Sequence, residues 1–325
     1  MIQKQKFIIF IILILILLVV FISKKESFEN SYFYTLDKSK EIMSDKKYFK
    51  FFNKKDLQLR GLKNINDCAN TYMINTIDFT KDEKKNIKEF INNFISKLSK
   101  YQNIFTNIKI IKVNDNIESG LPHTRNNAIV LSSSWLDLYL SMYLLDLNID
   151  FAKLISHEQF HIIQRNNPKL FNDLYSNYWE MEEYNVLPKK LLDINRTNPD
   201  ALPDNFWVFK IKDNSYILPL CIYKNKSSNI RDTQNVYFNL IKKNNKFEFT
   251  DLDNEITNPK LLSNNQEFKN YFGNEVSNNY HPNELSASLF EILIENNLEN
   301  KKNNSNIPAL VKLEKFLQKK IDFII

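Results

Sequence analysis

The first hydrophobic segment of the chain, residues 7–22, consists of sixteen consecutive apolar residues with lysines close to both ends. A helix of this length covers about 24 Å, and flanking lysine side chains can extend to the interface and help span a hydrocarbon core of roughly 30 Å. A cleavable signal peptide is the alternative, but no small-residue cleavage site follows the segment. We therefore expect residues 1–26 to be a signal-anchor and transmembrane segment.

The orientation of this expected anchor is indicated only by its short N-terminal tail. Lysines lie on both sides of the apolar segment, so the charge bias alone does not decide. A positively charged tail of six residues tends to remain cytoplasmic. The expectation is a single-pass membrane protein with residues 27–325 on the non-cytoplasmic side.

Residues 79–165 contain both helical and strand-like patterns. Thr80 and Glu83 form a capping box, followed by apolar residues at helical spacing through about Lys100. Residues 104–113 and 128–131 are predicted to be strands. Residues 132–134 and 148–150 offer caps for two further helices, and a proline-initiated helix is expected from Pro168.

The pattern changes to strands in residues 200–250, where runs at 206–211, 216–223, 236–241 and 246–250 are separated by polar turns. Helical patterns return at 282–297 and 308–323. Because helices and strands do not alternate regularly, the predicted fold class is α+β. We expect one domain over residues 27–325, with 200–250 as a strand-rich insertion and 280–325 as a helical part. Residues 196–200 form an ordinary turn by composition and receive no role.

Composition excludes several classes of site. With only three glycines, Gly61, Gly120 and Gly273, the chain cannot form a glycine-rich phosphate loop or a dinucleotide-binding fingerprint. The net charge of +6 is mild and the lysines are scattered, so no nucleic-acid partner is expected. Cys68 and Cys221 are too few for a disulfide scaffold or a cysteine-based zinc site, and whether they are bridged stays open.

The strongest chemical signal is the segment His157-Glu158-Gln159-Phe160-His161. Residues four apart lie on one face of a helix, so His157 and His161 can direct two imidazoles to one zinc ion. Glu158 is placed to act as the general base that takes a proton from water. The chain has only four histidines, which makes a chance occurrence of this spacing rare.

A catalytic zinc ion normally has three protein ligands, so one more is expected. The best candidate is Glu284, because Pro282 favours a helix start just before it and an apolar helical pattern follows. Other candidates for the third ligand remain open: Glu180, Glu182, Glu183 and His281.

HExxH followed by the later Asn283-Glu284-x-x-Ala287 resembles the gluzincin clan of zinc metallopeptidases, and residues 157–164 resemble its minimal HExxHxxQ form. The resemblance implies a zincin-like domain with an active-site helix, one zinc ion held by His157, His161 and Glu284, and an edge strand beside the metal. It covers well under a tenth of the chain. The chain departs from the family in the 123 residues between His161 and Glu284, and in Ser288, where the family has an acidic residue that supports the metal ligands.

The resemblance also suggests where substrate binds. Gluzincins bind extended peptides along their edge strand, and residues 128–131 are the candidate for it. His123 and Arg125 are then possible substrate contacts. Tyr280 and His281 are candidates to donate a hydrogen bond to the developing oxyanion.

The predicted function is a membrane-anchored zinc metallopeptidase that hydrolyses peptide or protein substrates with a metal-activated water. The alternative is a catalytically inactive zincin scaffold that serves as a membrane-tethered binding or structural module. The missing acid at Ser288 and the long insertion motivate this alternative. The sequence predicts no oligomeric state.

Overall fold

The structure is a computed structural model that describes residues 32–143, 149–198, 200, 206–274, 276, 279–301 and 306–320. The apolar segment at 7–22, predicted to be a transmembrane anchor, lies outside these residues. Within them, no helix is both long and apolar enough to cross a membrane. The longest one described, α7 (Ile149–Asn166), carries four charged residues: Asp150, Lys153, Glu158 and Arg165.

This finding corrects the predictions that depended on a membrane-spanning helix. The residues that the structure describes form a mixture of helices and strands, and none of these helices is a transmembrane helix. The localisation as a single-pass membrane protein is likewise unsupported, and so is the placement of the domain on the non-cytoplasmic side.

A four-stranded sheet lies beside the helix that carries the HExxH segment. Its order is β1-β2-β4-β3, with β2 and β4 parallel and the other pairs antiparallel. Every residue of β4 is buried. The strands are β1 (Thr76–Ile77), β2 (Ile110–Val113), β3 (His123–Arg125) and β4 (Ala128–Ser132).

The prediction that residues 128–131 form the edge strand is wrong, because β4 pairs with β2 on one side and β3 on the other. Its uninterrupted apolar run is typical of a strand covered on both faces. The edge strand next to β4 is β3. The first part of the predicted strand 104–113 is also not a strand, since residues 102–105 form a 3₁₀ turn.

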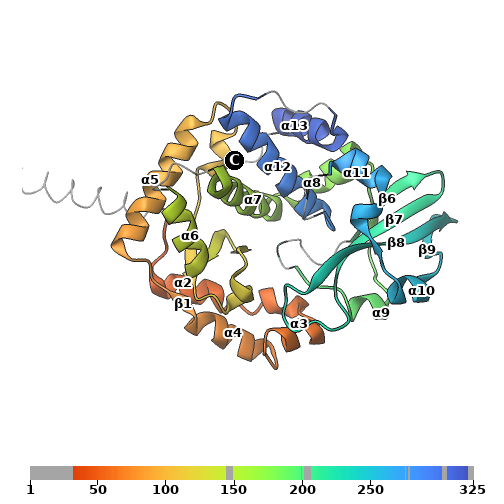
Figure 1. Cartoon of the computed structure of the whole chain (residues 1–325), viewed down its shortest axis with the longest axis horizontal. Coiled ribbons are helices and arrows are strands. Elements are labelled where there is room, and N and C mark those ends of the chain that lie inside the picture. The colour runs from red at the N-terminus through yellow and green to blue at the C-terminus, as the bar shows by residue number, and fades with distance from the viewer. Residues whose placement is uncertain are drawn as a thin grey trace, which may run out of the picture.

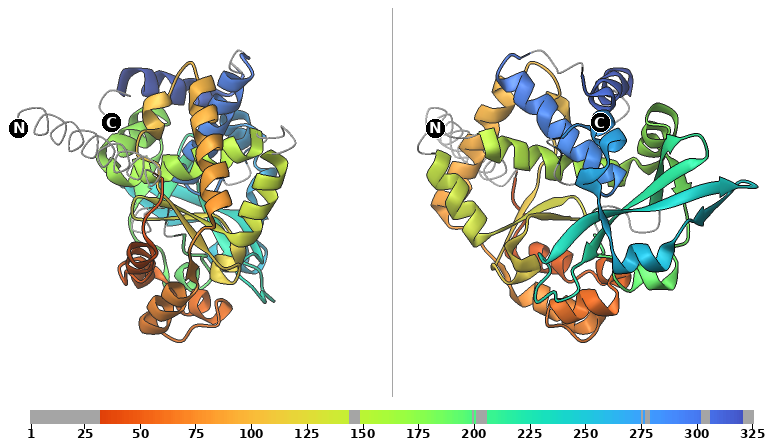
Figure 2. Two further views of the ribbon diagram at one scale, coloured as in Figure 1. Left: turned by 90° about the vertical axis from the view of Figure 1, so that its left-hand side faces the viewer. Right: turned by 45° about the vertical axis from the view of Figure 1, so that its right-hand side comes forward.

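Helices cover both faces of this sheet (Figure 2). Alternating side chains of β2 and β4 enter two cores: Ile110 and Ile129 join the core with α5 and α7, whereas Ile111 and Val130 join the core of the N-terminal helices. The N-terminal helices are α2 (Leu36–Met43), α3 (Lys54–Leu59) and α4 (Ile65–Ile74). None of the three was predicted from the sequence.

The predicted helices of the larger core are present with small changes in their ends. Thr80 and Glu83 form the expected capping box of α5. The helices are α5 (Lys81–Lys97), α6 (Ser133–Tyr143), α7, α8 (Pro168–Asp173), α12 (Pro282–Leu298) and α13 (Pro308–Lys320). In Figure 1, α7 and α12 lie side by side near the centre, although more than a hundred residues separate them in sequence.

The strand-rich part forms a second sheet of six strands, with the order β10-β8-β7-β6-β5 and β9 paired to β8. Asn244 and Asn245, both with positive φ, form the tight turn between β8 and β9, as asparagine tolerates this conformation. The strands are β5 (Glu182–Tyr184), β6 (Phe206–Lys212), β7 (Ser215–Tyr223), β8 (Thr233–Lys243), β9 (Lys246–Phe249) and β10 (Lys260–Leu261). Three short helices accompany them: α9 (Lys189–Leu192), α10 (Leu252–Thr257) and α11 (Gln266–Phe272).

Candidate metal centre

Helix α7 is held rigidly where it carries the HExxH segment. Every residue from Ile155 to Gln164 is buried. Phe160 stacks on Phe290 of α12 with 4.5 Å between ring centroids, and the Gln159 side-chain amide donates to the Ile104 carbonyl at 3.0 Å. The helix therefore presents His157 and His161 from a fixed position against α12.

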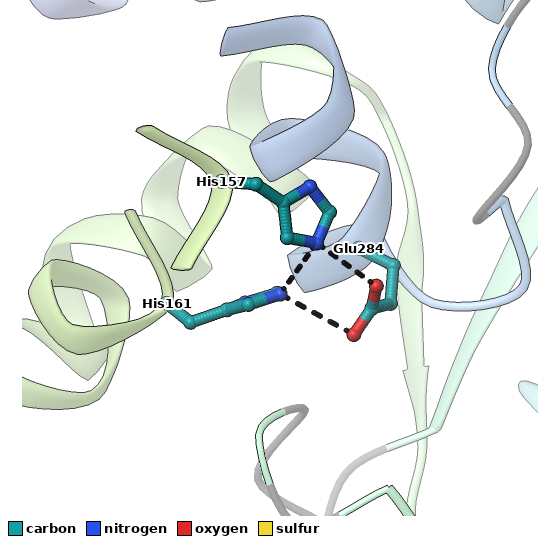
Figure 3. Close-up of side chains that lie close together, drawn as sticks. All are labelled: His157, His161 and Glu284. Atoms are coloured by element: carbon teal, nitrogen blue, oxygen red, sulfur yellow. Dashed lines mark hydrogen bonds and ion pairs between the residues drawn. The ribbon is translucent and has the colours of Figure 1, made fainter. Parts of the chain in front are cut away.

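The side chains of His157, His161 and Glu284 converge on one point (Figure 3). The two Nε2 atoms are 3.0 Å apart, and the Glu284 oxygens lie 3.5 Å from Nε2 of His157 and 3.4 Å from Nε2 of His161. Two donors at about 2.0–2.1 Å from one tetrahedral zinc ion are separated by roughly 3.3 Å. The three side chains are therefore close enough to hold one metal ion.

Hydrogen bonds behind the two imidazoles orient them. Nδ1 of His157 lies 2.5 Å from Oε1 of Glu291, and Nδ1 of His161 lies 2.9 Å from Oε1 of Gln164. Because these oxygens are acceptors, each Nδ1 carries the proton, and in the neutral ring the Nε2 lone pair faces the centre. Gln164 is itself fixed, since its amide nitrogen donates to the Asn283 carbonyl and to Ser286.

Glu291 was not identified from the sequence, which pointed to the position four residues after Glu284. That position is Ser288, and the carboxylate that supports His157 comes instead from seven residues after Glu284. A spacing of seven is two helical turns, so Glu291 lies on the same face of α12 as Glu284. The helical spacing could have identified it.

The charges at the centre are mutually dependent. Burial alone would raise the pKa of Glu284, but the neighbouring His161 and His157 hold it well below its usual value. Burial alone would lower the pKa of His157, but the carboxylates of Glu284 and Glu291 raise it well above its usual value. The cluster thus favours positive charge between its side chains. Either bound protons or a divalent cation can supply this charge.

Glu158 is a buried carboxylate next to the convergence point. It is 5% exposed, and its Oε2 has no hydrogen-bond partner in the described part of the chain. Burial raises its pKa to about 7, against the opposing charge of His157. Leaving such an oxygen unpaired is costly, and a carboxylate with a pKa near neutrality is suited to accept and return protons.

These side chains line a hollow of about 130 Å³ that also receives residues from distant elements. Tyr48 and Arg60 come from the N-terminal region, and Thr197, Asn198 and Asp200 come from the segment between α9 and β6. Asn198 donates hydrogen bonds to Oε1 of Glu284 at 2.5 Å and to the Tyr280 hydroxyl at 2.6 Å. Assigning no role to residues 196–200 was therefore wrong, because this turn contacts the proposed ligand.

Three of the four residues suggested as substrate or oxyanion contacts lie near the candidate metal centre, but they do not all line the same hollow. Tyr280 and His123 line the hollow. Nδ1 of His123 donates to the Leu121 carbonyl at 3.0 Å, while its buried Nε2 has no partner among the described residues. His281 caps α12 by accepting from the Asn283 amide, and it lines a neighbouring hollow, not this one.

Arg125 is placed elsewhere. Its guanidinium lies 3.4 Å from the centroid of the Tyr48 ring and donates to the Met43 carbonyl at 2.6 Å. It belongs to the packing between β3 and the N-terminal helices and is not among the residues that line the hollow.

His281, at the N-cap of α12, is not part of the converging group, and the three glutamates that were candidates for the third ligand lie in a different part of the fold. Glu180 pairs with Lys312, Glu182 pairs with Lys242, and Glu183 is exposed on β5. In the part of the chain that the structure describes, His157, His161 and Glu284 are the one group of three or more histidine, cysteine or acidic side chains close enough to hold a metal ion. Cys68 and Cys221 are both free and buried.

The edge strand β3 is partly occupied by the protein itself. The Thr124 amide, which the edge strand would offer to a peptide, donates to Oδ1 of Asp200 at 3.1 Å. Arg165 reinforces this contact by binding Asp200 at 3.0 Å and the Asn126 carbonyl at 2.6 Å. A substrate therefore cannot use the Thr124 amide unless Asp200 moves.

No protein-family model, curated protein or solved structure matches this chain.

Proposed function

We propose that the chain is a zinc-dependent peptidase. The observation that carries the proposal is the combination of three converging ligand groups, His157, His161 and Glu284, with the unpaired buried oxygen of Glu158 in the same hollow. Neutral imidazole nitrogen and carboxylate oxygen are the ligands that catalytic zinc takes in proteins.

When bound at these three side chains, zinc supplies a Lewis acid that polarises the scissile carbonyl and acidifies water. Glu158 accepts a proton from the attacking water and returns it to the leaving amine nitrogen. Its position directly after His157 keeps its carboxylate beside the ligand set, in the same hollow, where it can reach a water held there.

Tyr280 is the donor best placed to stabilise the oxyanion. The pKa of Tyr280 is raised well above its usual value by burial and by Glu284, so the hydroxyl stays protonated. Because Asn198 donates to the Tyr280 oxygen, the hydroxyl proton is free to point to another acceptor in the hollow. A hydrogen bond that forms as negative charge develops on the carbonyl oxygen lowers the barrier.

His123 has the opposite character. Its Nδ1 proton is used by the Leu121 carbonyl, and burial lowers the pKa of the ring, so Nε2 carries a lone pair at neutral pH. In this proposal His123 accepts a hydrogen bond from a substrate N–H group and does not stabilise the oxyanion.

One of the two observations that supported a non-catalytic scaffold no longer does so. The acid expected at position 288 is absent, but Glu291 supplies the equivalent hydrogen bond to His157. The long segment between the two zinc-ligand helices remains as the other motive.

The test is metal analysis and peptide hydrolysis with the purified full chain. We expect one zinc ion per chain, and cleavage of a mixed peptide library that stops on chelation and returns with zinc. Glu183→Gln, an exposed glutamate on β5, is the matched control and retains both properties. Zinc binding without cleavage of any library member would support the non-catalytic scaffold, and absence of zinc binding would contradict the zinc peptidase.

A further inference from the structure

A second hollow of about 300 Å³ adjoins the one at the candidate metal centre. Arg196, Thr197, Asn198 and Tyr280 line both hollows. Since Asn198 and Tyr280 are hydrogen-bonded to each other and Asn198 to Glu284, the shared wall adjoins the proposed zinc ligand. A substrate that reaches the centre has this second hollow beside it.

The shared wall is fixed in position. The Arg196 amide donates to the Cys221 carbonyl of β7 at 2.8 Å. The Thr197 amide donates to Oδ1 of Asp56 at 3.2 Å, and the Thr197 hydroxyl donates to the Phe51 carbonyl at 3.1 Å. The backbone on both sides of the Arg196 side chain is therefore held by the second sheet and by the N-terminal region.

Arg196 has no carboxylate of its own in the described part of the chain. It forms no ion pair there, and its buried Nε has no hydrogen-bond partner. The negative charge of Glu118 acts on Arg196. Glu118 is, however, already bound by Nε and Nη2 of Arg60, at 3.1 and 2.6 Å. Asp200 is held by Thr124 and Arg165.

An arginine in such surroundings favours an anionic ligand. Guanidinium is always charged, and its planar donors match the two oxygens of a carboxylate. The rest of the second hollow is largely apolar, with Leu192, Trp207 and Leu220 in its walls. Arg196 is partly buried, and low polarity around a cation strengthens its attraction for a counter-charge.

We propose that Arg196 binds a carboxylate of the substrate in the second hollow, so that the protein selects peptides with a carboxylate close to the bond at the metal centre. This rests on the proposed peptidase function, because that function makes the substrate a peptide. The carboxylate has two possible sources, an acidic side chain or the free C-terminus. Both offer the same two oxygens.

The test separates binding from cleavage by using the full chain with Glu158→Gln, loaded with zinc. Calorimetry compares three peptides that differ only at one residue and at the C-terminus. The first has glutamate and an amidated C-terminus, the second has glutamine and a free C-terminus, and the third has glutamine and an amidated C-terminus. We expect at least one carboxylate peptide to bind roughly 10- to 100-fold more tightly than the third, as for other charge-assisted hydrogen bonds. The tighter peptide identifies the source.

The same series with Arg196→Gln, in the Glu158→Gln background, should show no preference. Arg231→Gln, an exposed arginine that lines neither hollow, is the matched control and keeps the preference. Equal affinity for all three peptides in the Glu158→Gln chain, or a preference that survives Arg196→Gln, would overturn the proposal. If Arg196→Gln does not fold, the peptide series with the arginine intact still decides.

Failure of this proposal is distinguishable from failure of the proposed function. Peptides cleaved by the unaltered chain without regard to their carboxylates would refute the role of Arg196 and leave the peptidase intact. Carboxylate-dependent binding by a zinc-loaded chain that cleaves no peptide would support Arg196 and refute the peptidase.

Discussion

Two buried polar clusters contribute to the same hollow and use their hydrogen-bonding groups differently. In the first, which we call the Arg60 network, Glu118 accepts from Arg60 and Tyr72, and Asp56 accepts from Tyr223 at 2.7 Å. In the second, the candidate metal centre, two imidazoles and a carboxylate face one another, and an oxygen of Glu158 is unpaired.

In the Arg60 network each buried carboxylate accepts hydrogen bonds from nearby donors, so we interpret the network as stabilising the fold. It connects α3 and α4 to the turn before β3 and to β7. Glu118, with φ of +49°, lies in a left-handed turn that costs free energy for a residue with a side chain. The ion pair with Arg60 helps to hold that turn in place.

The candidate metal centre has the opposite organisation, because hydrogen bonds hold its ligand groups from outside while both imidazole Nε2 atoms and the Glu284 carboxylate converge on one point. Glu291, Gln164 and Asn198 satisfy the outer sides of the ligand groups. The inner atoms face one another, and of these only Oε1 of Glu284 also accepts a hydrogen bond, from Asn198. Burial of charge therefore does not by itself distinguish a candidate site, whereas converging ligand atoms beside an unpaired carboxylate oxygen do.

The largest expected difference comes from making the same substitution in both clusters. Glu284→Gln removes a ligand charge, and we expect loss of zinc and of hydrolysis beyond the 10–100-fold that outer partners typically cost. Glu118→Gln should retain one zinc ion per chain while lowering stability. Metal analysis with thermal unfolding at added zinc checks both: zinc should raise the melting temperature of Glu118→Gln and not that of Glu284→Gln. Zinc bound normally by Glu284→Gln would remove that residue from the ligand set.

Breaking the Arg60 network at its cation should cost stability without abolishing the metal site. Arg60→Met leaves Glu118 and Asp56 buried without their cation, and removal of one partner of a buried pair typically costs about 3–5 kcal/mol. Urea unfolding measures the loss, and Lys54→Met, at an exposed lysine of α3, should change stability little. Equal costs for the two variants would show that the network does not stabilise the fold.

Weakening the outer support of the metal centre should have an intermediate effect. Glu291→Gln replaces the charged acceptor on Nδ1 of His157, and zinc affinity should fall by about 10–100-fold. Competition with a chelator of known affinity measures the change. Glu295→Gln, one turn further along α12 and paired with Lys153, is the control with unchanged affinity. Unchanged affinity in Glu291→Gln would mean that His157 needs no such support.

The smallest expected effect is the pH dependence of the Arg60 network. Burial alone would raise the pKa of Glu118, but Arg60 lowers it to about 2. A carboxylate whose pKa is lower in the folded state than in the unfolded state stabilises the protein at pH values above its unfolded-state pKa. This stabilisation is lost as the pH falls towards the folded-state pKa. Between pH 7 and pH 4 the contribution of Glu118 should fall by about 1 kcal/mol.

Urea unfolding at both pH values measures this contribution as the difference in unfolding free energy between the unaltered chain and Glu118→Gln. That difference should shrink as the pH falls. A difference that stays constant or grows would contradict the lowered pKa.

Much of the local structure followed from sequence patterns, because these report short-range periodicity. The four strands predicted between 206 and 250 correspond to β6 to β9, and the helices predicted from Thr80 and Pro282 begin at those caps. The N-terminal helices α2 to α4 were not predicted, since their apolar residues are mixed with many lysines and asparagines. The pairing of β4 on both sides was also missed, because strand order depends on contacts between distant segments.

The site shows the same limit. His157, Glu158 and His161 lie on one helical turn, so their spacing alone brings them together. Glu284 was selected by its local sequence, but its contact with Asn198 joins segments 86 residues apart and no sequence pattern indicates it. Arg196 was overlooked for the same reason: its turn is polar and short, and only the fold brings it to the wall of both hollows.

The central claim is tested most directly by Glu158→Gln in the full chain, with zinc content and peptide hydrolysis measured on the same preparation. The proposal predicts one zinc ion per chain, as in the unaltered protein, with hydrolysis reduced by roughly 10²–10⁴-fold. Hydrolysis that continues at the original rate while zinc remains bound would contradict the role of Glu158 and the proposed mechanism with it.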